Sequence, residues 1–114
     1  MKRSRRERLE DITEWGGRIA RHIRGMNFEE FAHDEKTFDA VSRCIAILGE
    51  AAARLLGESS TLQEQHPDLE LIAARAMRNR LSHASFGIDP QVLWDTAVLD
   101  VPRMVAAAER ALTG

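Results

Sequence analysis

Tyrosine is absent from this chain of 114 residues, and cysteine occurs once, as Cys44. A single cysteine cannot form a disulfide within the chain, so we expect a buried thiol in a reducing compartment. Apolar runs are shorter than the roughly 18 residues that span a bilayer, and the basic, polar start does not resemble a signal peptide. We therefore expect a cytoplasmic protein with no membrane partner.

Proline is also scarce, with three residues, whereas 44% of the chain is hydrophobic and 30% is charged. This balance is typical of a globular protein, and the abundant Ala, Leu, Arg and Glu favour helix. The length suits one hydrophobic core, so we expect a single domain over residues 1–114. Because the formal net charge is only −2, a nucleic-acid function would need a local basic patch.

Apolar residues recur at steps of three and four, the period of amphipathic helices. The pairs Ser4 with Glu7 and Asn27 with Glu30 are capping-box patterns, and they predict a first helix that ends near Gly25 and a short second one. A longer helix is expected to follow, from about residue 34 to residue 57.

Residues 59–66 are polar and turn-like and could form one helical turn, and a third long helix is expected after Pro67. The apolar face predicted for that helix consists of Leu69, Ile72, Ala76 and Met77.

Asp89 before Pro90 predicts the start of a last helix. A second start pattern, Asp100 followed by Val101 and Pro102, predicts that this helix is bent or broken there. No strand-like alternation is present in the sequence. The fold class expected is all-α, an up-and-down bundle of four to five helices.

A basic patch lies near the end of the third long helix, where no acidic residue occurs between Glu70 and Asp89. Arg78 is followed after four residues by His83, and a titratable histidine beside unopposed arginine suits phosphate chemistry. Arg75 and Arg80 could hold an RNA backbone.

Helix geometry separates the two leading side chains of this patch. Five residues turn an α-helix by about 500°, so Arg78 and His83 point about 140° apart. Asn79 and His83 share a face, so the Asn79 amide could orient the imidazole. Both motif residues could reach one phosphate only if the helix ended before His83 or if two copies met. The spacing favours a site across a symmetric dimer.

Cleavage of RNA by its own 2′-hydroxyl is the chemistry that best fits histidine with arginine and no metal cluster. His83 would act as general acid or base, and Arg78 would neutralise charge on the phosphate. DNA lacks that hydroxyl and is not expected as a substrate. The alternative is that Arg78 and Arg80 are solvent-exposed residues of a helix end, and that His83 interacts favourably with the C-terminal dipole of that helix.

The chain resembles the HepT-like branch of the HEPN superfamily, small helical toxins paired with a minimal nucleotidyltransferase antitoxin. Similarity extends over nearly the whole length. The matching stretches are residues 26–31, 34–37, 39–41, 48–52, 77–83, 86–89 and 100–102, together with Trp94.

The resemblance implies a HEPN-like bundle that forms homodimers and cleaves RNA without a metal or other cofactor. Its motif of arginine, four residues and histidine corresponds to Arg78 and His83, with Asn79 as the supporting polar residue. The function expected is a metal-independent endoribonuclease toxin whose antitoxin is a nucleotidyltransferase. The alternative is a non-catalytic dimeric module that binds such a nucleotidyltransferase.

Ser85 departs from the family pattern, which usually has tyrosine two residues after the histidine. The partner enzyme can modify that tyrosine with AMP, whereas this chain has no tyrosine. Either the Ser85 hydroxyl is modified instead, or the antitoxin neutralises the toxin by complex formation.

Other candidate residues favour structural roles. Glu30 and His33 have a spacing found in di-iron bundles, but such sites need a second copy of the motif, so no metal site is expected. For Glu50 a buried structural carboxylate, which could bond to a helix end, is favoured over a catalytic role. Trp15 and Trp94 are expected to anchor the core or a dimer interface.

Overall fold

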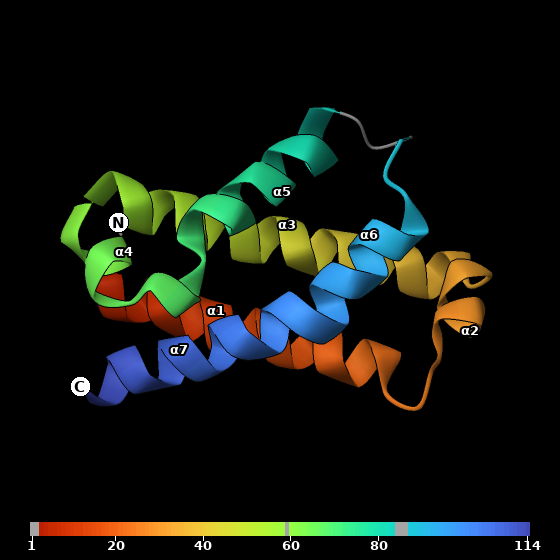
Figure 1. Ribbon diagram of the computed structural model, residues 1–114, viewed down its shortest axis with the longest axis horizontal. Coiled ribbons are helices and arrows are strands. Elements are labelled where there is room, and N and C mark those ends of the chain that lie inside the picture. Colours follow the sequence, from red (N-terminus) through yellow and green to blue (C-terminus); the bar gives the residue numbers. More distant parts are fainter. Residues whose placement is uncertain (1–2, 59, 84–86) are drawn as a thin grey trace.

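The helices form an up-and-down bundle in the computed structural model, which describes residues 3–58, 60–83 and 87–114 (Figure 1). Successive long helices run in opposite directions, and the two ends of the chain lie at the same end of the bundle. The helices are α1 (Arg5–Ile23), α2 (Phe28–Ala32), α3 (Glu35–Glu58), α4 (Ser60–Gln65), α5 (Leu71–His83), α6 (Pro90–Asp95) and α7 (Val101–Thr113), with a 3₁₀ turn η1 (Pro67–Leu69) and a π-helical segment η2 (Thr96–Asp100).

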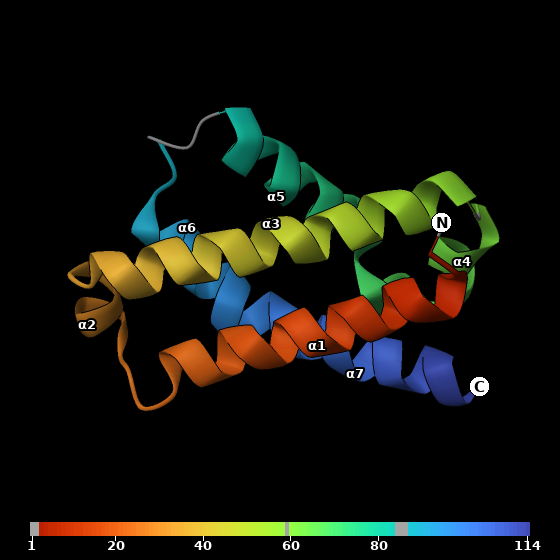
Figure 2. The same cartoon turned by 180° about the vertical axis from the view of Figure 1, so that it is seen from behind.

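The long helix α3 is the centre of this arrangement. It packs against α5 on one side and α1 on the other, and α7 packs against α1 (Figure 2). The described residues contain no strand, which confirms the predicted all-α, HEPN-like bundle. Within the same residues, no helix is both long enough and apolar enough to cross a membrane.

Three helix starts confirm the capping predictions. Ser4 exchanges hydrogen bonds with Glu7, and Asn27 does so with Glu30, in complete capping boxes. The Asp89 carboxylate accepts a hydrogen bond from an amide of the first turn of α6. Each cap satisfies backbone donors that a helix start leaves without a partner. The hydrogen bonds from Ser4 also hold the pKa of Glu7 below its ordinary value.

The buried face of α5 differs from the prediction. Leu69 is buried and Met77 packs against the core, as predicted. Ile72, however, is 56% exposed and Ala76 is also exposed, whereas Leu71 and Ala74 are buried in their place. The reason is a break at Glu70, whose φ of 52° turns the chain between η1 and α5. The predicted face is counted in steps of three and four from Leu69 in η1. Because the chain turns at Glu70, that count does not identify the buried residues of α5.

The predicted start at Asp100 is also corrected. Its backbone is helical and its carboxylate accepts a hydrogen bond from Arg103 at 2.8 Å, so it does not cap α7. The last α-helix is nevertheless interrupted where predicted, because Thr96–Asp100 widen into η2 before α7 begins at Val101. A proline lacks the amide donor and crowds the carbonyl four residues earlier, and a wider π turn accommodates both defects.

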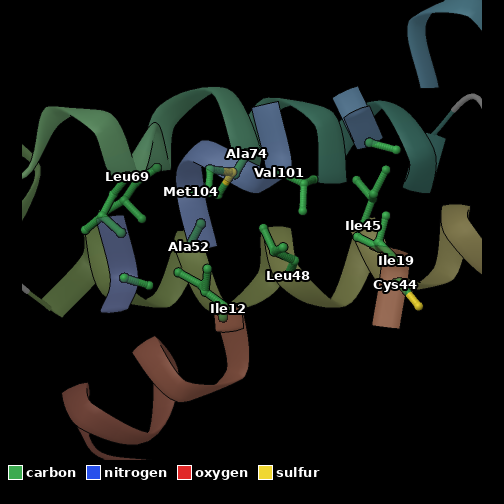
Figure 3. Packing of buried hydrophobic residues seen from close by; sticks show 14 of the residues in the cluster. Ile12, Ile19, Cys44, Ile45, Leu48, Ala52, Leu69, Ala74, Val101 and Met104 are labelled. Atoms are coloured by element: carbon green, nitrogen blue, oxygen red, sulfur yellow. The ribbon is translucent and has the colours of Figure 1, made fainter. Parts of the chain in front are cut away.

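The core lies between α1, α3, α5 and α7 (Figure 3). Cys44 belongs to it, at 4% exposure, as predicted, and burial raises the pKa of its thiol. Trp94 packs against the core with its ring centroid 5.3 Å from that of Phe31. Trp15 is half-buried at the core edge, where the Arg18 guanidinium stacks over it. Both tryptophans thus contribute to the core.

Candidate functional site

Arg78 sits where α5 crosses α3 at close range. The crossing depends on Gly49, since a Cβ placed there would lie 2.6 Å from the Arg78 Cβ and 2.7 Å from the Ala74 carbonyl oxygen. Only a residue without a side chain permits this separation. The arginine is consequently half-buried, with 26% of its side chain exposed.

Glu50 follows the crossing glycine and holds the Arg78 guanidinium. Its carboxylate accepts a hydrogen bond from Nη1 of Arg78 and another from Nε of Arg54, the latter at 2.8 Å. Partial burial opposes ionisation of this carboxyl, but the hydrogen bonds from Arg78 and Arg54 outweigh that effect and lower the pKa of Glu50. The prediction of a buried carboxylate is wrong, because 42% of the side chain is exposed.

Asn79 also contacts the arginine. Its Oδ1 accepts a hydrogen bond from Nε of Arg78 at 2.9 Å. Among the described residues no hydrogen bond joins Asn79 to His83, although the two share a face of α5. The amide therefore orients the arginine of the motif in this structure.

His83 lies at the last position of α5 and is exposed. Because α5 continues to this residue, the turn of about 140° between Arg78 and His83 applies. The imidazole therefore points away from the α3 side, where the arginine is held. Arg75 and Arg80 are exposed on the same helix, and neither forms an ion pair with a described residue.

An open groove of about 470 Å³ adjoins the arginine, between α3 and the C-terminal half of α5. In both views α5 stands farther from α3 towards its C-terminal end (Figures 1 and 2). The lining consists of Phe38, Asp39, Ser42, Arg43, Ala46, Ile47, Glu50, Arg78, Leu81, Ser82 and Ile88. His83 is not part of this lining.

The remaining candidates take other positions. Ser85 lies outside the described residues. Glu30 closes the cap of α2, and Nδ1 of His33 lies 2.8 Å from the Glu29 carbonyl oxygen, so both side chains serve local helix structure. Within the described chain no group of three or more metal-ligating side chains comes together.

Sequence reasoning missed the contact between Glu50 and Arg78. The available indication was Gly49, which precedes the glutamate among small residues and allows another helix to approach. A long side chain beside such a crossing can reach the incoming helix. What could not be read from the sequence was which residue of that helix it would meet.

Known proteins resemble the chain along most of its length. A protein of Thermococcus cleftensis named "Probable ribonuclease HepT" is 38% identical over 110 residues, covering 96% of this chain and 97% of the relative. "Putative RNase MJ1216" of Methanocaldococcus jannaschii is 29% identical, covering 90% of this chain and 82% of the relative. No solved structure matches the chain significantly. The model of the family "Ribonuclease HepT-like" matches residues 8–111, and the chain belongs to this HepT-like family of the HEPN superfamily.

Proposed function

We propose that the chain is a metal-independent endoribonuclease toxin that acts as a homodimer, with Arg78 and His83 at the seam between two copies. The observation that carries the proposal is the placement of Arg78, a half-buried guanidinium held by Glu50 and Asn79 on the wall of an open groove. Relatives with ribonuclease names support RNA as the substrate.

The hydrogen bonds of Arg78 align the guanidinium and leave it able to bind phosphate. Arginine has five N–H donors, and the bonds to Glu50 and Asn79 use two of them. With Arg54 on the same carboxylate, the cluster of two arginines and one glutamate carries a net positive charge. Both features favour a phosphate whose negative charge grows in the transition state.

In the proposed reaction His83 removes the proton from the 2′-hydroxyl of the substrate. The 2′-oxygen bonds to phosphorus and the bond to the 5′-oxygen breaks, which gives a 2′,3′-cyclic phosphate and a 5′-hydroxyl end. The leaving oxygen takes its proton from water or from His83 of a second copy. Arg78 stabilises the pentavalent phosphate, a contribution that is typically worth about 10²–10³ in rate.

The test is cleavage of RNA in EDTA with detection of the cyclic phosphate. His83→Ala should abolish cleavage, and its exposed position means that the fold should survive, as checked by circular dichroism. His22→Ala on exposed α1 is the matched control and should cleave normally. Activity that needs a divalent metal, or that persists in His83→Ala, would refute the mechanism.

Mixed dimers test the seam. His83→Ala and Arg78→Ala are each expected to be inactive alone. In a mixed dimer of the two variants, one seam keeps an intact Arg78 from one copy and an intact His83 from the other. Co-refolding them should restore partial cleavage, whereas a site contained within one copy would stay inactive in every combination.

We extend the proposal to a nucleotidyltransferase antitoxin, which the family resemblance supports. Ser85 replaces the tyrosine that such partners modify, so neutralisation here would use complex formation or modification of the serine. Expression without the partner should arrest growth. A chain that neither arrests growth nor cuts RNA would instead be a non-catalytic module for the same partner.

A further inference from the structure

We propose that the groove between α3 and α5 binds the RNA strand beside the scissile phosphate, and that Asp39 at the far end of the groove selects a base with an exocyclic amino group. The inference rests on the proposed RNase function, because it assigns the scissile phosphate to Arg78. The groove has a volume of about 470 Å³, within the range of roughly 300–1,000 Å³ that is usual for small-molecule sites.

The groove continues from Arg78 along α3. Its floor is apolar, since Ala46 and Ile47 of α3 face Leu81 of α5 across it. A nucleobase has an apolar face and a polar edge, so it can lie on such a floor while its phosphate stays at the arginine. The phosphate end and the base end of one nucleotide are thus matched by adjacent parts of one surface.

Arg43 is available for the next phosphate of the strand. It lies seven residues before Glu50, about 10 Å along α3, and both side chains line the groove. Unlike Arg54 and Arg78, it forms no ion pair with any described residue. A guanidinium without a carboxylate partner can bind phosphate without breaking an existing bond.

Asp39 provides the base selectivity. It lies one turn before Arg43 on the groove wall, about 16 Å along α3 from Glu50, so it reaches a base beyond the phosphate held by Arg43. Within the described chain its carboxylate has neither a hydrogen bond nor an ion pair. An ionised carboxylate only accepts hydrogen bonds, so it favours an amino group such as the N4 of cytosine. At the same position uracil presents a carbonyl oxygen, which the carboxylate repels.

RNA binding to a chain that cannot cut RNA tests this inference separately from catalysis. All variants carry His83→Ala, and fluorescence anisotropy follows short labelled oligocytidine and oligouridine. Oligocytidine should bind several-fold more tightly, and Asp39→Asn should remove the difference. Equal affinities in the His83→Ala chain would mean that no base is read by this groove.

Arg43→Gln tests the phosphate contact by salt dependence. It should weaken binding and lower the slope of log affinity against log salt by about 0.7, the value for one phosphate of a single strand. Arg24→Gln is the matched control, because this exposed arginine follows α1 and also lacks an ion pair among the described residues. Equal effects of the two changes would overturn the assignment of Arg43.

Ala46→Leu tests the floor by adding volume where the base should lie. Binding should weaken about tenfold while helix content and sedimentation behaviour stay the same. If Ala46→Leu and Arg43→Gln instead dissociate dimers, the groove is an interface between copies and the inference fails. A different outcome is that the groove variants weaken RNA binding although the chain with an intact His83 does not cut RNA. That outcome would support the groove as an RNA-binding site and refute the proposed nuclease function.

Discussion

Replacing Gly49 by alanine tests the helix crossing on which the candidate site depends. The new Cβ would lie 2.6 Å from the Arg78 Cβ and 2.7 Å from the Ala74 carbonyl oxygen. Both contacts are far inside van der Waals distance and one is to backbone, so α3 and α5 must separate. Overpacking of this kind costs about 1–3 kcal/mol.

Alanine also improves helix propensity over glycine by about 0.8–1 kcal/mol, which would mask part of that cost. Gly57→Ala removes this ambiguity, because it makes the same change in the same helix with nothing within 4 Å of the added Cβ. The propensity gain cancels between the two variants. Their difference in free energy of unfolding should therefore equal the overpacking cost of about 1–3 kcal/mol.

Urea denaturation at one protein concentration measures that difference. Gly57→Ala should be slightly more stable than the parent, and Gly49→Ala should be less stable than Gly57→Ala. Since Arg78 moves with α5, cleavage should fall in Gly49→Ala and remain in Gly57→Ala, because small displacements of catalytic groups cost up to about 10² in rate. Equal stability of the two variants would refute the close crossing.

Two further predictions concern Glu50 and Cys44. The pKa of Glu50 is lowered by its bonds to Arg78 and Arg54, so its stabilising contribution is complete above the ordinary value of 4.5 and is lost as pH falls through the lowered value. Glu50→Gln should therefore be less stable than the parent at pH 7, and the difference should vanish in acid; a constant difference would contradict the ion pair. Cys44 is 4% exposed with its pKa raised by burial, so iodoacetamide should label the native protein far more slowly than the urea-unfolded chain. Rapid labelling of the native protein would contradict its place in the core.

Local chemistry determined the helix starts and the fold class of this protein. Ser4, Asn27 and Asp89 each cap a helix with bonds to residues within three positions, so the sequence contains both partners of the interaction. The same reasoning failed at Asp100, where Pro102 imposed a π segment. It also failed across Glu70, because the left-handed backbone of this residue changes which side chains of α5 face the core.

The tertiary structure alone decided how the motif is arranged. The spacing predicts that Arg78 and His83 point apart. Only the crossing at Gly49 shows that Arg78 contacts Glu50 and lines a groove, and that His83 is not part of the lining of this groove. These partners lie 28 residues apart in the sequence, and no period of a single helix relates them. Contacts between helices depend on crossing points, which small residues permit and the packing of the whole core selects.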